Sequence, residues 1–206
     1  MAKGAETAGG LESGEALGAV LAGGRGSRIG GAKATAELAG RPLISYPLAA
    51  LAAAGIEPFV VAKPASALPP LSCPVIREPE LPRHPLCGIV AALRAAEGRP
   101  VVVVACDMPL AAPPLLAHLA AANGRLLVPA PAGRLQPLQA RYAAELLAAL
   151  EAALEREEPL RRTVESLTPS LLGEEEIARF GNPGRLFFNV NDGDDLRHAE
   201  QLLAAQ

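Results

Sequence analysis

The sequence predicts an α/β fold with a mostly parallel sheet, and three observations lead to this prediction. Short apolar runs, typical of strands buried on both faces, alternate with Ala- and Leu-rich segments typical of helices. A glycine-rich loop follows the first apolar run, and Asp107 follows a valine-rich run later in the chain. Because ligands bind outside the carboxyl ends of the strands in such sheets, we expect the loop and Asp107 at one edge.

Strand-like and helix-like segments alternate through the first half of the chain. Strands are predicted over residues 16–22, 58–63, 74–78 and 101–106. Helices are predicted over residues 42–55, 88–98 and 113–123. Gly55 ends the first of these helices, and prolines lie near the start of the last.

The second half of the chain is less regular. Apolar segments at 125–130 and 135–142 precede a long helix predicted over 143–158, and a Pro-rich, charged connection follows. A late strand is predicted over 185–191, and a final helix over 194–206 begins with acidic residues at its positive end. We predict a single domain over residues 16–206, preceded by a flexible tail over residues 1–15.

Composition excludes several classes of function. The 206 residues are half hydrophobic, which is enough for one substantial core. With 3% aromatic residues and a net charge of -3, the chain lacks the stacking side chains and the basic surplus of nucleic-acid-binding proteins. No apolar run approaches the roughly 20 residues that span a bilayer, and the first fifteen residues lack the apolar middle of a secretory signal. We therefore expect a soluble, cytoplasmic protein with no nucleic-acid or membrane partner.

The three cysteines are widely spaced among apolar residues and form no Cys-x-x-Cys pair. We expect Cys73, Cys87 and Cys106 to be reduced thiols of the core rather than metal ligands or nucleophiles.

The stretch AVLAGGRGSRIGGAK, residues 19–33, has the character of a phosphate-binding loop. Glycines let the backbone approach a ligand and point N–H groups at oxyanions, while Arg25, Arg28 and Lys33 supply positive charge. The loop lacks the Gly-Lys-Ser/Thr of a P-loop, and its G-x-G-x-x-x-G spacing differs from the dinucleotide fingerprint. A purely structural loop is the alternative interpretation.

Asp107 is the second candidate for binding chemistry. An aspartate at the carboxyl end of a buried strand, facing the glycine-rich loop, is well placed to hold Mg²⁺ against phosphate oxygens. The alternative is a helix-capping or turn aspartate ahead of Pro109.

Several segments together resemble the molybdenum cofactor guanylyltransferase family. They are LAGGRGSRIGGAK with LAGRPL, HPLCGIVAAL, VVVVACDMP, QPLQARY and FFNVNDGDDL, similar in order and spacing to the family over residues 17 to about 200. The first motif is shared by many nucleotidyltransferases, whereas its combination with CDMP, QPL and NVN is more specific. The resemblance implies a Rossmann-like three-layer nucleotidyltransferase fold and the transfer of GMP from GTP to molybdopterin, with release of pyrophosphate. It also implies Mg²⁺ as cofactor, and molybdoenzyme-maturation proteins as partners.

The resemblance also assigns catalytic and nucleotide-binding residues. Arg28, Lys33 and Asp107 are expected to be catalytic: the two cations neutralise the departing pyrophosphate, and the carboxylate holds Mg²⁺. The residues expected to bind the nucleotide are Leu21, Ala22, Gly23, Gly24, Lys33, Glu78 and Asp107. No general base is required, because an acceptor phosphate is already ionised at neutral pH. The three histidines are therefore expected to have surface or capping roles.

Three amide side chains are candidates for substrate contacts. Asn189 and Asn191 match paired asparagines of the family, and they are expected to bind substrate or complete the metal shell. A turn before the final helix is the alternative for both. Gln136, in QPL, is expected to touch the pterin side, with a buried strand amide as the alternative.

Glu78 is the residue expected to favour guanine. It matches the aspartate that ends the third strand in the family, and a carboxylate there would accept from the adjacent N1–H and N2–H₂ donors of guanine. Backbone carbonyls at the strand ends are the alternative acceptors. The chain departs from the family at Ala32, where an acidic residue is common, and at Ala62, where an asparagine is common. Lys63, which follows Ala62, lies outside the glycine-rich loop and is expected to matter less than Lys33.

Other functions are left open by the sequence. A molybdopterin cytidylyltransferase, or a nucleotidyltransferase acting on another phosphorylated acceptor, would share the glycine-rich loop and Asp107. A nucleotide-binding module without turnover is an alternative of a different class. The presence of Lys33 and Asp107 favours an enzyme.

Overall fold

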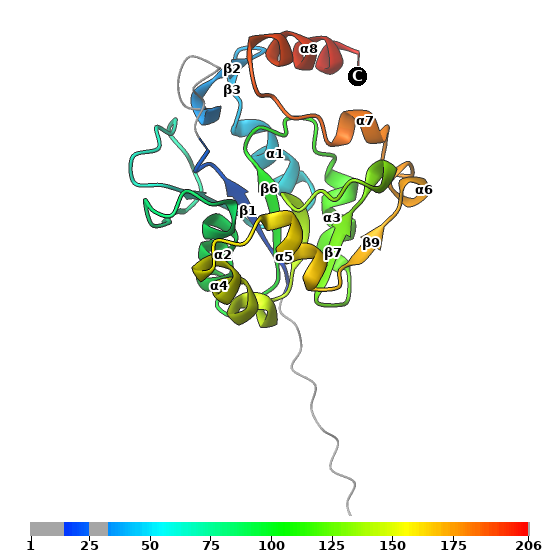
Figure 1. The fold of residues 1–206 in the computed structure, drawn as a ribbon. Coiled ribbons are helices and arrows are strands. Elements are labelled where there is room, and N and C mark those ends of the chain that lie inside the picture. Colours follow the sequence, from blue (N-terminus) through cyan, green and yellow to red (C-terminus); the bar gives the residue numbers. More distant parts are fainter. Residues whose placement is uncertain (1–14, 25–32, 206) are drawn as a thin grey trace, which may run out of the picture.

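A seven-stranded sheet lies between two layers of helices in the computed structural model, which describes residues 15–24 and 33–205 (Figure 1). The strands are β1 (Leu17–Leu21), β4 (Pro58–Ala62), β5 (Val75–Arg77), β6 (Val101–Ala105), β7 (Leu126–Pro129), β8 (Gln139–Tyr142) and β9 (Ser170–Leu172). Their order is β5-β4-β1-β6-β8-β7-β9, and β8 alone runs antiparallel to its neighbours. The predicted α/β fold with a mostly parallel sheet is confirmed.

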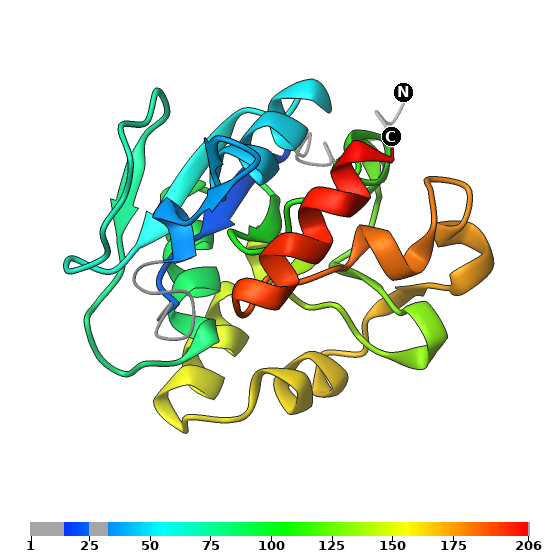
Figure 2. The same ribbon diagram turned by 90° about the horizontal axis from the view of Figure 1, so that it is seen from above.

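Two pairs of helices cover the opposite faces of this sheet (Figures 1 and 2). One face carries α1 (Ser45–Ala53) and α3 (Pro113–Ala121), and the other carries α2 (Pro85–Ala95) and α4 (Leu147–Glu155). The remaining elements are a hairpin of β2 (Glu37–Leu38) and β3 (Arg41–Pro42), and the helices α5 (Leu160–Ser166), α6 (Glu174–Ile177), α7 (Pro183–Leu186) and α8 (Gly193–Ala204). None of the helices within the described ranges is long and apolar enough to cross a membrane.

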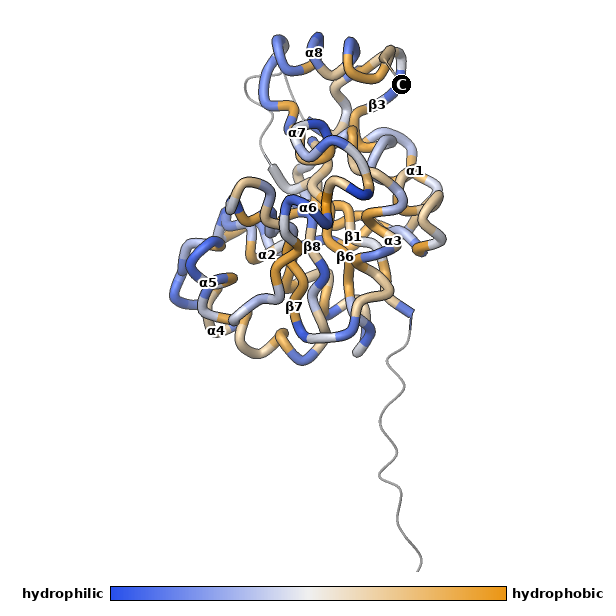
Figure 3. Tube along the Cα trace, turned by 90° about the vertical axis from the view of Figure 1, so that its right-hand side faces the viewer, coloured by the Kyte–Doolittle hydropathy of each residue, from blue (hydrophilic) through white to orange (hydrophobic). Residues whose placement is uncertain are grey.

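Alternate residues of the central strands enter two separate cores. In β6, Val101 and Val103 pack towards α2 and α4, whereas Val102 and Val104 pack towards α1 and α3. Burial on both faces explains why the sequence of this strand is a continuous apolar run. Figure 3 shows the resulting concentration of hydrophobic residues around β1 and β6. On β1, a Cβ at Gly18 would lie 2.7 Å from Leu51 Cδ2, so glycine permits the close packing of α1.

The predicted strand over residues 185–191 is wrong. Asn182 accepts a hydrogen bond from Gly184 N, and Pro183 occupies the first turn, so a short helix, α7, begins there instead. Phe187 and Val190, which follow it, are buried without joining the sheet, and Val190 N donates to the carbonyl oxygen of Asp107 at 2.9 Å. Apolar composition therefore indicated burial correctly but not strand pairing.

Other predicted boundaries shift by a few residues or divide. The helix predicted from residue 88 begins at Pro85, because the His84 side chain caps it by accepting from Leu86 N. The segment predicted as one helix over 143–158 contains a 3-10 turn, Ala144–Leu146, before α4. The charged connection that follows contains α5, β9 and α6, which the sequence did not predict. Most of the predicted N-terminal tail lies outside the described residues.

The parallel part of the sheet brings distant residues to one edge. The four consecutive strands β5, β4, β1 and β6 are parallel, so their carboxyl ends meet at the same edge. The residues just beyond these ends, in the order of the strands, are Glu78, Lys63, Gly23 and Asp107. Because β4 and β6 lie on opposite sides of β1, the connections reverse direction there, and ligands bind at such positions.

Candidate functional site

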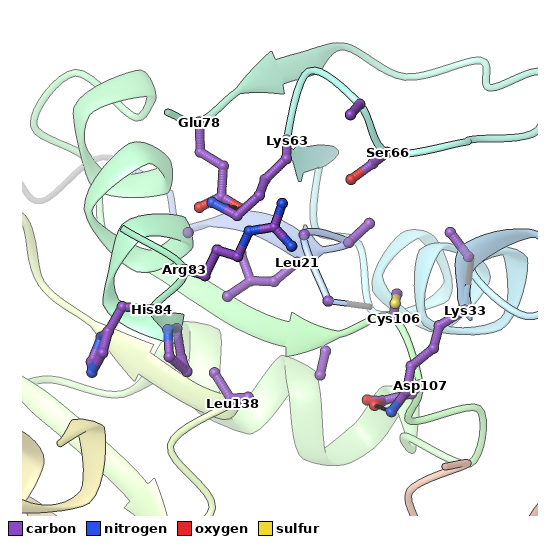
Figure 4. Close-up of a pocket in the computed structure, with 18 of the residues that line it drawn as sticks. Leu21, Lys33, Lys63, Ser66, Glu78, Arg83, His84, Cys106, Asp107 and Leu138 are labelled. Carbon is purple, nitrogen blue, oxygen red and sulfur yellow. Dashed lines mark hydrogen bonds and ion pairs between the residues drawn. The ribbon is translucent and has the colours of Figure 1, made fainter. Parts of the chain in front are cut away.

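A cavity of about 780 Å³ opens at the carboxyl edge of the parallel strands (Figure 4). This volume falls within the range of roughly 300–1,000 Å³ that is typical of small-molecule sites. Every residue predicted to bind the nucleotide lines it: Leu21, Ala22, Gly23, Gly24, Lys33, Glu78 and Asp107. The prediction that the first strand end and Asp107 meet at one edge is confirmed.

Lys33 and Asp107 form a charged pair at one end of the cavity. Lys33 Nζ lies 2.6 Å from Asp107 Oδ2 and donates a second hydrogen bond, at 3.0 Å, to Asn191 Oδ1. The bond from Val190 N to the Asp107 carbonyl brings the segment before α8 to this position, and Asp195 Oδ2 accepts from Asn191 N at 2.7 Å. A cation therefore already lies between a carboxylate and an amide oxygen.

The carboxylate of Asp107 and the amide oxygen of Asn191 are also suitable ligands for a divalent cation. Asp107 Oδ1 is buried and has no hydrogen-bond partner in the described part of the chain, and carboxylate and amide oxygens are the ligands that Mg²⁺ prefers. The residues described contain no cluster of three His, Cys, Asp or Glu side chains that could hold a metal alone. Mg²⁺ at Asp107 would thus take further ligands from water and phosphate oxygens.

Glu78 and Lys63 form a second charged pair at the other end of the cavity (Figure 4). Their side chains are 5% and 10% exposed, and Lys63 Nζ lies 3.7 Å from Glu78 Oε1. Burial raises the pKa of the Glu78 carboxyl, and the nearby Lys63 ammonium opposes that increase. A Cβ at Gly23 would lie only 2.0 Å from Glu78 Oε1, so the carboxylate occupies space that glycine leaves free.

Lys63 lies closer to the predicted nucleotide-binding residues than the sequence indicated. It was expected outside the phosphate site because it lies outside the glycine-rich loop, yet it lines the same cavity and pairs with Glu78. The signal was its position directly after a predicted strand. Arg83 and His84 also line the cavity without having been predicted to, although the capping role of His84 is confirmed.

The remaining predicted residues have different positions. Arg28 lies outside the described residues. Asn189 lines the cavity, and its Nδ2 donates to Phe187 O at 3.1 Å, so its contact with substrate stays a prediction. Gln136 is half-buried and is not among the residues that line the cavity, so its contact with the pterin side stays a prediction. Outside the cavity, His118 lies against Phe180 and His198 against Phe188.

Cys106 lines the cavity beside Asp107, but its thiol is not a candidate nucleophile. Burial, with the neighbouring Asp107 carboxylate, raises the pKa of its thiol to about 12, so it stays protonated at neutral pH. None of the three cysteines is in a disulfide, and Cys87 is also buried. The expectation of reduced thiols agrees with this arrangement.

The fold and this site define a class of protein. A parallel α/β sheet with Gly23, Gly24 and Asp107 beyond its strand ends, and with Lys33 beside them around one cavity, is typical of nucleotide-binding domains that contact phosphates. The family model for the MobA-like NTP transferase domain matches residues 18–171. The chain belongs to this family.

Relatives and a solved structure agree with the family assignment. A probable molybdenum cofactor guanylyltransferase of Pyrococcus furiosus is 37% identical over 200 residues, covering 91% of this chain and 97% of the relative. The molybdenum cofactor guanylyltransferase of Rhizobium leguminosarum bv. trifolii is 35% identical, covering 93% and 94%. The crystal structure of molybdopterin-guanine dinucleotide biosynthesis protein A from Archaeoglobus fulgidus superposes with a TM-score of 0.76 at 28% identity, covering 92% of this chain and all of that one.

Substitutions at the two adjacent glycines should separate the role of Glu78 from that of the loop backbone. In Gly23→Ala the new methyl group must displace the Glu78 carboxylate and disrupt its pair with Lys63, which should cost about 1–3 kcal/mol of the free energy of unfolding. Among the described residues, a Cβ at Gly24 meets no atom within 4 Å, so Gly24→Ala is the matched control and should be tolerated. Chemical denaturation of both variants measures the difference. Equal stabilities, with Glu78 unmoved in a crystal structure of Gly23→Ala, would contradict this account.

Proposed function

We propose that the protein is a molybdenum cofactor guanylyltransferase, which transfers GMP from GTP to molybdopterin. An oxygen of the acceptor phosphate attacks the α-phosphorus of GTP, the bond between that phosphorus and the oxygen bridging to the β-phosphorus breaks, and pyrophosphate leaves. The observation that carries the proposal is that one cavity has the Lys33–Asp107 pair at one end and the buried Glu78–Lys63 pair at the other. The names of relatives 35–37% identical over most of the chain support it.

The Lys33 end suits the triphosphate. An ammonium there forms charge-assisted hydrogen bonds that strengthen as negative charge develops on the departing pyrophosphate. Because the acceptor phosphate is already ionised, the reaction needs positioning and charge neutralisation rather than a general base. This chemistry agrees with a cavity whose reactive end holds Lys33, Asp107 and the neutral thiol of Cys106.

Mg²⁺ dependence is part of the proposal. Asp107 would hold the ion through its buried, unpartnered Oδ1, with Asn191 Oδ1 as a neighbouring oxygen ligand. Bound there, Mg²⁺ would neutralise the oxyanions of the triphosphate. A cytoplasmic location is also proposed, and the absence of any disulfide among the three cysteines agrees with a reducing compartment.

Asp107→Asn should fold normally and lower turnover by about 100-fold or more, because it removes the carboxylate charge from the reactive end of the cavity. Asp194→Asn is the matched control, since it makes the same change on an exposed side chain of α8 and should leave turnover unchanged. Steady-state pyrophosphate release at saturating Mg²⁺, with thermal unfolding to confirm folding, measures both effects. Near-normal turnover of a folded Asp107→Asn protein would contradict the assignment of Asp107.

The proposed function itself is tested by measuring pyrophosphate release with molybdopterin, Mg²⁺ and each triphosphate in turn. GTP should give the highest kcat/KM, by tenfold or more, because guanine alone offers the adjacent N1–H and N2–H₂ donors to Glu78. A higher kcat/KM with CTP would show that the protein transfers CMP rather than GMP. Binding of a triphosphate without release of pyrophosphate would instead identify a nucleotide-binding module without turnover.

A further inference from the structure

The Lys63–Glu78 pair has hydrogen-bonding capacity that the protein leaves unused. Lys63 Nζ has three donors, and its hydrogen bond among the described residues goes to Pro79 O at 2.7 Å. Glu78 Oε1 lies 3.7 Å away, beyond hydrogen-bond distance. Glu78 Oε2 is buried and has no hydrogen-bond partner in the part of the chain described. At least one ammonium donor and most of the carboxylate's acceptors therefore remain available to a ligand.

Such a pair is costly to keep without a ligand. Buried charged groups lose hydration, and an unsatisfied buried acceptor costs roughly 1–3 kcal/mol. Both side chains point into the cavity from the ends of adjacent strands, β4 and β5 (Figure 4). Backbone contacts hold them there: Glu78 N donates to Ala62 O at 3.0 Å, and Arg77 Nη1 donates to Lys63 O at 2.9 Å. The arrangement places an ammonium donor beside a carboxylate acceptor, at the end of the cavity away from Asp107.

The complementary ligand presents an acceptor beside adjacent donors. Guanine does so along one edge, with O6 as the acceptor and N1–H and N2–H₂ as the donors. Adenine presents a donor at position 6, where it would face the ammonium. Cytosine presents N3 and O2, two acceptors that would face the carboxylate. The charge pattern of this pair thus matches guanine and opposes both of these bases.

We propose that Lys63 is a specificity-determining residue, whose ammonium donates to O6 of guanine while Glu78 accepts from N1–H and N2–H₂. This inference rests on the proposed guanylyl transfer and deepens it, because it gives the base two partners of opposite charge. The two lysines then have separate roles: Lys63 acts on the base, and Lys33 acts on the triphosphate.

Binding of base-modified triphosphates tests the two contacts separately. ITP lacks only the 2-amino group of GTP, and 6-thio-GTP replaces O6 by the weaker acceptor sulfur. Dissociation constants are measured by calorimetry with Mg²⁺ and without molybdopterin, so that no transfer occurs. The wild-type protein should prefer GTP over both analogues, each by about ten- to hundred-fold, which is the range for losing one hydrogen bond to a charged group.

The variants should divide these preferences. Lys63→Met should bring the ratio of GTP to 6-thio-GTP affinity close to one and leave the preference over ITP in place. Glu78→Gln should bring the ratio of GTP to ITP affinity close to one and leave the preference over 6-thio-GTP in place. Lys63→Gln, which retains a donor, should recover part of the preference for O6 and provides a second variant if Lys63→Met is unstable. Arg99→Met is the charge control, because Arg99 makes an exposed ion pair with Glu57 and is not among the residues lining the cavity.

The outcomes separate this inference from the proposed function. If the wild-type protein prefers GTP but Lys63→Met and Lys63→Gln keep its full preference over 6-thio-GTP, the role of Lys63 is wrong and guanylyl transfer stands. If these variants weaken every triphosphate equally, CTP included, Lys63 supports the cavity structurally and the inference also fails. A wild-type preference for CTP would overturn both proposals.

Discussion

The common direction of four adjacent strands is the constraint on which the site depends. Because β5, β4, β1 and β6 run parallel, the chain must leave each of them at the same edge of the sheet. The valine-rich strands are buried on both faces, which agrees with a parallel sheet whose connections place helices on each side. Gly23 and Asp107, which are 84 positions apart in the sequence, are thereby placed around one cavity.

Pairs of opposite charge lie at both ends of the cavity, and each pair keeps polar groups that a nucleotide could contact. The Lys33–Asp107 pair keeps a cation where phosphates would lie, and this lysine must change partners when a triphosphate or a metal ion arrives. The Glu78–Lys63 pair is more deeply buried, and Gly23 leaves the space that its carboxylate occupies. The Lys33–Asp107 pair would therefore change its hydrogen-bond partners when a nucleotide binds, whereas the Glu78–Lys63 pair would keep its position and offer the base a fixed pattern of hydrogen bonds.

The sequence predicted the sheet, most of its strands and a set of residues that line one cavity, because apolar runs and the residues after them follow directly from burial and strand direction. It failed where the outcome depended on tertiary partners. The run before Asn191 looked like a strand, but its backbone pairs with Asp107 instead of an available strand edge. Lys63 looked peripheral because nothing local shows that β4 and β5 place it against Glu78. Charge pairs between strands cannot be read from spacing along one strand.

A crystal structure with GTP and Mg²⁺, in the absence of molybdopterin, tests the central claim that one cavity binds the base and the triphosphate at opposite ends. The account predicts the guanine ring beside Glu78 and Lys63, the phosphates at Lys33, and Mg²⁺ on Asp107. A nucleotide bound in the reverse orientation, with its base beside Asp107, or bound outside this cavity, would contradict it.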